Sequence, residues 1–381
     1  MTSGNAGGRG PILPPATIGM LGGGQLGRYA LVAARQMGYR TIVLDPDPLA
    51  PAGAIADEHL VAAFDDATAL DRLAAECAVV TTEFENAPAA AMRRLAAAVR
   101  VAPGPDAVAT VQDRIAEKSF LVAHGLPVGP YGVLVSVTDV LYAADDAAVA
   151  WPARLKTARL GYDGKGQVVV TDPDQLRAAW QALGSVPCVL EQALDLDREL
   201  SVVAARGADG EFVAYTVAEN AHAGGILDVT TVGGVDAEAS AAAVALARRV
   251  AEALGYVGVL AVELFDSGGR LLVNEIAPRP HNSGHWTLDV ARTSQFAQQI
   301  RAVCGLALGD PTMTAGGAAM ANLLGDRWAG GEPDWSAAVT AATALHLYGK
   351  AEPRAGRKMG HVTAWGDTPT AARERVLAAR G

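Results

Sequence analysis

The sequence predicts a mixed α/β and α+β protein, with a Rossmann-like parallel-sheet domain at the N-terminus and a small β-rich domain at the C-terminus. Three observations predict this class. The first third of the chain alternates short apolar runs with helical patterns, the middle contains long strands joined by hairpin turns, and the last part contains mainly short strands. For 381 residues we expect a disordered lead at 1–15, a Rossmann-like domain at 16–115, a smaller subdomain at 116–185, a larger subdomain at 186–315 and the β-rich domain at 316–381.

The composition excludes several classes of protein. The formal net charge of −10 makes the chain a poor partner for nucleic acid, although a local basic pocket can still bind a small anion. No apolar run approaches the roughly 20 residues of a membrane-spanning helix, and the Gly- and Pro-rich start lacks the apolar core of a signal peptide. The three cysteines, Cys77, Cys188 and Cys304, stand far apart in apolar runs. We therefore expect buried thiols in a reducing cytoplasm and no membrane.

The N-terminal domain is predicted from strands and helices that alternate along the chain. Parallel sheets with right-handed crossovers arise from this order. The expected strands are 17–21, 41–45, 59–64, 78–82 and 99–103, and the expected helices are 25–37, 67–77 and 106–124.

A glycine-rich motif lies between the first strand and the first helix. Residues 22–27 spell GGGQLG, which matches the dinucleotide fingerprint G-x-G-x-x-G, and Asp45 ends the next strand. The motif alone is compatible with a nicotinamide oxidoreductase. Two other interpretations stay open: the glycines could simply permit tight strand-to-helix packing, or the amides at the helix start could bind another anion such as a sugar phosphate.

The middle of the chain opens with strands expected at 153–157, 167–171 and 188–192 around a helix at 173–183. Lys156 ends the first of these strands, facing the space that the following loop can cover. Glycines make such a loop mobile, and its amides can close over phosphate groups. A nucleotide-phosphate site is therefore favoured over a simple glycine-rich hairpin, although the P-loop pattern does not occur. The loop consists of Gly161, Tyr162, Asp163, Gly164, Lys165, Gly166 and Gln167.

Two hairpins follow, separated by an amphipathic helix at 236–254. Strands at 199–206 and 212–218 flank Asp-Gly, and strands at 258–266 and 270–275 flank Ser-Gly-Gly.

The second hairpin contains the acids Glu263 and Glu275. Both are equally distant from residue 269 in the turn, so they should lie nearly opposite each other on adjacent strands. Neighbouring carboxylates among apolar residues repel unless a cation lies between them. Mg²⁺ binds one or two carboxylates together with substrate phosphates. We therefore interpret the pair as Mg²⁺ ligands for a nucleoside triphosphate, with Asn274 beside them, rather than as two solvated acids.

The last segments are polar or basic. Residues 278–286 follow the second hairpin and contain two prolines that stiffen the loop, with Arg279 suited to hold an acyl phosphate. Short strands are expected at 318–324 and 346–348, and a helix at 370–379. A basic cluster would form a phosphate pocket only if it folds back onto the site, and would otherwise be solvated. Its members are Lys350, Arg354, Arg357 and Lys358.

Together these segments resemble the ATP-grasp ligases, and among them the N5-carboxyaminoimidazole ribonucleotide synthetases. The resemblance covers nearly the whole chain after residue 15, and the string NEIAPRPHNSGHW at 274–286 is highly specific. It implies an ATP-grasp fold in which the smaller subdomain is a lid. The other matching stretches are GGGQLGR at 22–28, TTEFEN at 81–86, QDR at 112–114, GYDGKGQ at 161–167, DREL at 197–200, VELF at 262–265, LYGK at 347–350 and GRKMGH at 356–361.

The resemblance implies an ATP-dependent carbon–nitrogen ligase of purine biosynthesis. In that family ATP phosphorylates bicarbonate to carboxyphosphate, and the amine of 5-aminoimidazole ribonucleotide then takes up the carboxyl group, with release of ADP and phosphate. The implied cofactors are ATP and Mg²⁺. A cytoplasmic homodimer and a separate mutase that receives the product are also expected.

The resemblance also assigns residues by matching motif. Glu263 and Glu275 would hold Mg²⁺. The ATP contacts would be Arg114, Lys156, the loop 161–167, Glu191, Gln192, Ala193, Leu194, Glu199, His222, Asn274 and Glu275. The ribonucleotide contacts would be Gly23, Gln25 and Glu83, with Lys350, Arg357 and Lys358 at its phosphate. The catalytic residues would be Lys156, Asp163 as the candidate base for the amine, and Arg279 with Asn282 for bicarbonate or carboxyphosphate.

This chain departs from the family pattern in small ways. Leu160 replaces a glycine before the loop, and Ala193 with Leu194 replaces the aromatic residues that often follow Glu-Gln, so packing against adenine could differ. Three other functions are alternatives to this one. A nicotinamide oxidoreductase is supported by the first motif alone. Formate-dependent glycinamide ribonucleotide transformylase has S-P-R-P-H-D-T-G where this chain has APRPHNSG. A non-catalytic binding module could have lost the acids, which are present here.

Overall fold

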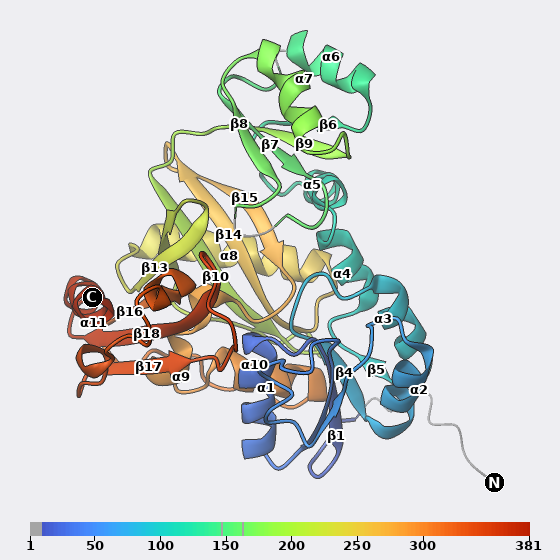
Figure 1. Cartoon of the computed structure of the whole chain (residues 1–381), viewed down its shortest axis with the longest axis vertical. Helices are drawn as coiled ribbons and strands as arrows, with labels where there is room; N and C mark the ends of the chain where they lie inside the picture. The colour runs from blue at the N-terminus through green and yellow to red at the C-terminus, as the bar shows by residue number, and fades with distance from the viewer. Residues whose placement is uncertain (1–9, 146–147, 162–163) are drawn as a thin grey trace.

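The computed structural model describes residues 10–145, 148–161 and 164–381, and three β-sheets organise this part of the chain. Figure 1 shows the four-stranded sheet at the top, projecting from the rest, while the N-terminal sheet and the C-terminal strands lie at the opposite end. The nine-stranded sheet lies below the four-stranded sheet and includes the C-terminal strands.

The N-terminal sheet has the order β3-β2-β1-β4-β5, and every neighbouring pair is parallel. The parallel sheet predicted from the alternating pattern is therefore confirmed. Its strands are β1 (Thr17–Leu21), β2 (Arg40–Leu44), β3 (Glu58–Leu60), β4 (Val79–Thr82) and β5 (Arg100–Val101), and its connecting helices are α1 (Gln25–Gln36), α2 (Ala67–Glu76) and α3 (Ala89–Ala96).

Both faces of this sheet are covered, because successive side chains of a strand point to opposite sides. Ile18 and Met20 pack against α1 and against α10 (Gln295–Cys304), a helix that the sequence analysis did not predict. Leu21 and Val80 pack on the other face with residues of α2 and α3. The helix α10 comes from the far end of the chain, so it ties the N-terminal domain to the nine-stranded sheet.

Two short helices replace the single helix expected at 106–124. They are α4 (Pro105–Val111) and α5 (Arg114–Ala123). The break has a local cause: the Asp113 carboxylate accepts hydrogen bonds from the amides of Ile115 and Ala116 and so caps a new helix.

The four-stranded sheet has the order β6-β9-β7-β8 and is antiparallel. Two helices pack on one face around buried residues such as Leu155 and Trp180. The domain boundary expected at residues 185 and 186 is wrong in one respect, because β9 pairs with β6 and β7 and belongs to this smaller unit. The elements are β6 (Tyr131–Leu134), α6 (Val137–Asp145), β7 (Ala153–Thr157), β8 (Gln167–Val170), α7 (Pro173–Ala182) and β9 (Cys188–Gln192).

The nine-stranded sheet has the order β15-β14-β10-β12-β13-β16-β18-β17, with β11 paired to β10. The helix α8 (Ala237–Ala253) covers one face of β10 and β14. The strand expected at 212–218 is divided between β11 and β12. The strands are β10 (Arg198–Arg206), β11 (Phe212–Ala214), β12 (Ala218–Ala223), β13 (Ile226–Val232), β14 (Gly258–Ser267), β15 (Arg270–Ala277), β16 (Gly317–Leu324), β17 (Thr343–Leu347) and β18 (Lys358–Gly366).

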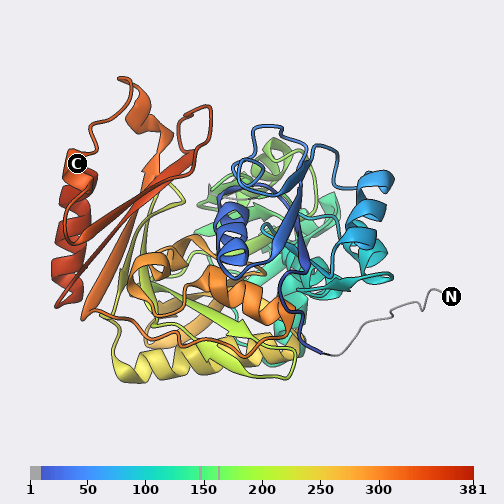
Figure 2. The same ribbon diagram turned by 90° about the horizontal axis from the view of Figure 1, so that it is seen from below.

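The C-terminal strands do not form a sheet of their own. The strand β16 pairs with β13, so the expected β-rich domain is an extension of the central sheet. Figure 2 shows these strands on one side with α11 (Pro369–Arg380) along their outer face.

The start of the described chain is fixed in place. The amide of Ile12 donates to the carbonyl of Cys304 at 2.8 Å, and the Arg100 guanidinium donates to the carbonyl of Gly10 at 2.9 Å. The expectation of a disordered lead is therefore wrong for residues 10–15, while residues 1–9 lie outside the described residues. The three cysteines are buried free thiols, as predicted. Among the described helices, none has the length and apolar character that crossing a membrane requires.

Candidate active site

The two acids of the second hairpin are paired in the sheet. Glu263 on β14 lies opposite Glu275 on β15, as the sequence analysis predicts. The pairing depends on a β-bulge: Leu264 faces Val273, so a regular ladder would place Asn274 opposite Glu263. The bulge inserts Asn274 as the extra residue and brings the two carboxylates to the same face of the sheet.

Each acid of this pair also has a cationic or polar neighbour. The Glu263 carboxylate lies 3.0 Å from Nε2 of His281, and Arg114 donates to Glu275 Oε2 at 2.8 Å. Burial raises the pKa of Glu275, but the Arg114 guanidinium, together with Lys156 and His281, outweighs burial and lowers this pKa to about 2. Two partly exposed carboxylates on adjacent strands form the oxygen donor set that Mg²⁺ prefers, so the residues present fit this ion.

The four-stranded sheet, which we call the lid sheet, contributes Lys156 from β7. Its Nζ donates to Glu191 Oε2 at 2.5 Å, and Lys118 of α5 lies 3.2 Å from the other oxygen of the same carboxylate. Burial raises the pKa of Glu191, but Lys156 and Lys118 together lower it to about 2. Lys156 also contributes to the lowered pKa of Glu275, so the ammonium group of Lys156 acts electrostatically on that carboxylate.

The glycine-rich loop closes toward the central sheet. A Cβ atom on Gly164 would lie 3.0 Å from the carbonyl oxygen of Gly224, in the turn between β12 and β13. Gly164, Gly166 and Gly225 all have positive φ angles, of 77°, 70° and 81°. Two glycine turns therefore meet at a separation that side chains would block. The predicted residues Tyr162 and Asp163 lie outside the described residues.

Other predicted ATP contacts lie on β10 and β12 and at the end of β9. The imidazole Nδ1 of His222 on β12 lies 3.1 Å from the Glu199 carboxylate on β10. Burial lowers the pKa of His222, but the carboxylates of Glu199, Glu263 and Glu275 together outweigh burial and raise this pKa. Gln192, Ala193 and Leu194 follow directly after Glu191, and the amide of Ala193 donates to the carbonyl of Pro152 at 2.9 Å.

The N-terminal glycine turn does not offer free amides to a phosphate. Gly23 donates its N–H to Asp45 at 2.7 Å, while Gly24 and Gly27 donate to Glu83 at 2.9 and 3.0 Å. These carboxylates occupy the positions that a pyrophosphate would need, and a second anion would be repelled. The nicotinamide interpretation is therefore wrong.

The glycines of this turn permit close packing instead. A Cβ on Gly23 would lie 2.6 Å from Cβ of Ala50, and a Cβ on Gly27 would lie 2.9 Å from the carbonyl oxygen of Gly22. Burial raises the pKa of the Glu83 carboxyl. Gln25, at the start of α1, is partly exposed, and its contact with the ribonucleotide stays a prediction.

The loop 278–286 lies between the acidic pair and the C-terminal strands. Arg279 donates to Glu85 at 2.5 Å, an acid of the N-terminal domain. Both polar atoms of the Asn282 side chain are buried without a hydrogen-bond partner among the described residues. A buried amide without partners indicates a place for a polar ligand or water.

The basic C-terminal cluster folds back onto the N-terminal domain. A Cβ on Gly349 would lie 3.9 Å from Arg28 of α1, and the ring of Tyr348 lies 6.2 Å from the ring of Tyr29. Lys350, which follows β17, donates to the carbonyl of Lys358 at 2.8 Å. The segment therefore packs on the N-terminal domain, and its role as a phosphate pocket stays a prediction.

Comparisons with known proteins agree with this arrangement. Family models match a ribonucleotide synthetase preATP-grasp domain at residues 15–112, an ATP-grasp domain at 119–296 and a phosphoribosylaminoimidazole carboxylase C-terminal domain at 318–375. The N5-carboxyaminoimidazole ribonucleotide synthase of Brucella melitensis is 45% identical over 356 residues, which cover 92% of this chain and 97% of that protein. The corresponding Bacillus subtilis protein is 42% identical over 354 residues, with 92% of each chain covered.

The chain belongs to the N5-carboxyaminoimidazole ribonucleotide synthase family.

Solved structures of this synthase family have the same fold. The ADP complex of one N5-carboxyaminoimidazole ribonucleotide synthetase matches with a TM-score of 0.91 at 39% identity, covering 97% of both chains. The Aspergillus clavatus synthase in complex with ADP and 5-aminoimidazole ribonucleotide matches with a TM-score of 0.85 at 28% identity, covering 96% of this chain and 97% of that one. The ATP-grasp fold that the sequence predicts is thereby confirmed.

Residues of α5 contact the strand that carries the acidic pair, and the sequence analysis of this synthase-family chain missed two of them. Glu117 accepts the amide of Ile276 at 2.7 Å, and Lys118 donates to the carbonyl of Asn274 at 3.0 Å. With Arg114 on Glu275, one face of α5 therefore contacts three successive residues at the bulge. Arg114, Glu117 and Lys118 have the spacing i, i+3, i+4, which puts them on one face of a helix that begins after Asp113. This spacing in the sequence could have identified them.

Proposed function

We infer that this chain converts 5-aminoimidazole ribonucleotide to N5-carboxyaminoimidazole ribonucleotide with consumption of ATP. We propose that bicarbonate is the carbon source, that carboxyphosphate is the intermediate and that Mg²⁺ accompanies ATP. The single observation that carries the proposal is the register of Glu263 opposite Glu275, within electrostatic reach of the lid lysine Lys156. ATP-grasp chemistry needs this combination because phosphoryl transfer depends mainly on positioning and charge neutralisation.

Glu263 and Glu275 would hold Mg²⁺, which when bound would neutralise charge on the phosphates. Lys156 is already poised at this place, because its ammonium group is held by Glu191 at 2.5 Å and can turn to a phosphate oxygen when the nucleotide enters. Arg114 would contact the nucleotide from its position on Glu275. The two glycine turns that meet at Gly164 and Gly225 would close the lid and keep water from a labile acyl phosphate.

The acceptor side would lie between the loop 278–286 and the basic C-terminal cluster. Arg279 would hold the bicarbonate or carboxyphosphate anion, and the unpartnered amide of Asn282 would complete its hydrogen bonds. Lys350, Arg357 and Lys358 would bind the 5′-phosphate of the ribonucleotide. Asp163, outside the described residues, stays the candidate for removing the proton from the amine.

We also propose a homodimer in the cytoplasm, with the product passed to a separate mutase. Three buried free thiols fit a reducing compartment. Light scattering coupled to size exclusion at several protein concentrations measures the mass, and a monomer at all of them would contradict the dimer.

The proposed reaction is tested by ADP release with and without 5-aminoimidazole ribonucleotide, each with and without bicarbonate. We expect rapid release only when both are present. Glu275→Gln should lose this activity, and Glu252→Gln on the exposed face of α8 is the matched control that should keep it. Release that is independent of bicarbonate in carefully degassed buffer would contradict the proposed carbon source.

A further inference from the structure

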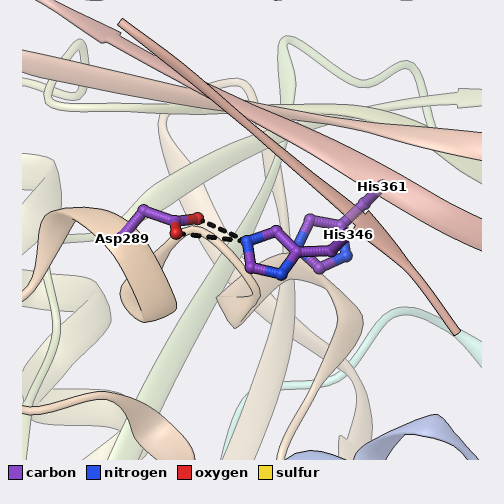
Figure 3. Close-up of side chains that lie close together, drawn as sticks. All are labelled: Asp289, His346 and His361. Carbon is purple, nitrogen blue, oxygen red and sulfur yellow. Dashed lines mark hydrogen bonds and ion pairs between the residues drawn. The ribbon is translucent and has the colours of Figure 1, made fainter. Parts of the chain in front are cut away.

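A second group of metal-ligating side chains lies away from the acidic pair. Asp289 of α9 (Thr287–Val290), His346 of β17 and His361 of β18 form what we call the Asp-His-His cluster. One possible ligand atom from each residue lies within 4.8 Å of the other two. Figure 3 shows the two imidazole rings one behind the other, beside the Asp289 carboxylate.

The sheet itself holds the two imidazoles together. His346 and His361 are direct partners in the ladder between β17 and β18, so both side chains project from the same face. Their rings stack with centroids 4.5 Å apart and planes inclined by 17°. The α9 helix then brings the third group, because both oxygens of Asp289 lie near Nε2 of His346, at 2.9 and 3.1 Å.

One atom of the cluster lacks a partner. His361 is fully buried, and its Nδ1 hydrogen-bonds the Tyr348 hydroxyl at 2.9 Å, which fixes the orientation of the ring. Its Nε2 is buried without any hydrogen-bond partner among the described residues. At histidine metal sites, one imidazole nitrogen binds the metal and the other forms a hydrogen bond that orients the ring. His361 has the same arrangement, with the Tyr348 hydroxyl on Nδ1 and with Nε2 left for a ligand. Buried nitrogens otherwise almost always have partners.

We propose that Asp289, His346 and His361 form a binding site for a divalent transition-metal ion of the zinc type. Two imidazoles and one carboxylate form a donor set typical of Zn²⁺, whereas the oxygen-only pair Glu263 and Glu275 suits Mg²⁺. The ion reaches the cluster from solvent, since the side chains of Asp289 and His346 are 17% and 20% exposed. Tetrahedral zinc ligands lie roughly 3.4 Å apart, so small side-chain rotations must draw the set together.

The position of the cluster indicates a structural role for the ion. The helix α9 follows the loop 278–286 directly, Lys350 lies three residues after the end of β17, and Lys358 is the first residue of β18. An ion bound to all three elements would fix the phosphate-binding strands relative to the catalytic loop. The site does not depend on the proposed reaction, because binding can be measured without any substrate.

The competing explanation is a metal-free ion pair between Asp289 and His346 that fastens α9 to β17. Asp289→Asn separates the two explanations, because an amide oxygen still accepts the hydrogen bond from His346 while the anionic ligand is lost. His346→Gln removes an imidazole at a partly exposed position, where the fold should tolerate it. His124→Gln, at an exposed histidine on another element, is the matched control.

Tag-free protein stripped with chelator is dialysed against Zn²⁺ in excess Mg²⁺, and zinc is counted by mass spectrometry. We expect about one zinc per chain, a rise in Tm of several degrees, and visible absorption when Co²⁺ replaces Zn²⁺. Asp289→Asn and His346→Gln should weaken binding at least about tenfold, and His124→Gln should not. Negligible zinc in the wild-type chain, or equal zinc content in all four proteins, would overturn the proposal.

Discussion

Lys118 offers the sharpest test of how the acidic pair is positioned. Its side chain is almost fully buried, donates to the carbonyl of Asn274 at 3.0 Å and lies 3.2 Å from Glu191. Lys118→Met keeps the length and the apolar stem but removes the ammonium group. The substitution therefore leaves the bulge carbonyl without its donor and Glu191 with Lys156 alone.

The size of the effect follows from these two contacts. An unpaired buried carbonyl costs about 1–3 kcal/mol, and breaking a buried ion pair costs about 3–5 kcal/mol. Because Lys156 still neutralises Glu191, the cost of the broken ion pair is reduced, and we expect a total below the sum of the two minima, about 3 kcal/mol. A change of 1 kcal/mol shifts the Tm of a domain of this size by roughly 2–4 °C, so the Tm should fall by about 6–12 °C.

The same variant should affect activity through the bulge. If Lys118 holds Asn274 as the extra residue, its loss allows Glu275 to drift from its place opposite Glu263. The Mg²⁺ concentration for half-maximal ADP release should then rise roughly tenfold, as for other losses of outer partners of metal ligands. Lys118→Arg retains the charge and should restore most of both properties. A Lys118→Met protein with unchanged Tm and unchanged Mg²⁺ dependence would refute the reasoning.

Three further predictions rest on other contacts. Glu275→Gln should abolish ADP release while the circular dichroism spectrum stays that of the wild type, and normal turnover at saturating Mg²⁺ would contradict the metal assignment. The pKa of Glu191 is about 2 in the folded chain, below the usual value of 4.5, so its stabilisation is complete above pH 4.5 and is lost as the pH falls toward 2. Glu191→Gln should therefore flatten the fall of Tm with acidification between these values, and a parallel pH profile would count against the ion pairs. Gly225→Ala places a methyl group 2.9 Å from Cα of Gly164, at a residue with a positive φ angle. The KM for ATP should therefore rise several-fold, while the Tm changes by only a few degrees. An unaltered KM would show that the two turns do not meet during turnover.

Local patterns predicted much of this structure. The strands 17–21, 153–157 and 188–192 have the predicted bounds. The sequence analysis also predicted that Glu263 lies opposite Glu275. It did so by counting from residue 269 and did not predict the β-bulge that produces this pairing. The turn is centred between Gly268 and Gly269 rather than on Gly269, which alone would pair Glu263 with Asn274. The extra residue Asn274 in the bulge shifts the register by one, so the predicted pair forms after all.

Long-range partners could not be predicted in the same way. Nothing in the local pattern of 188–192 shows that this strand pairs with β6 and β7 rather than with the larger sheet. The helix α10 was missed because its apolar residues, such as Phe296 and Ile300, stand among three glutamines that look solvated but are buried in the folded chain. The glycine motif suggested a nicotinamide site for a related reason. Only the tertiary structure shows that Glu83, far along the chain, accepts hydrogen bonds from the amides of Gly24 and Gly27.

The continuity of the nine-stranded sheet has a practical consequence for ligand design. The strands with the acidic pair and the strands with the basic cluster belong to one hydrogen-bonded ladder, whereas the lid is a separate sheet. The span from the proposed triphosphate site to the proposed ribose-phosphate site is thus a fixed length set by the backbone. A compound that joins a diphosphate mimic to a ribonucleotide mimic should bind best at one linker length, and its affinity should fall on either side of that length.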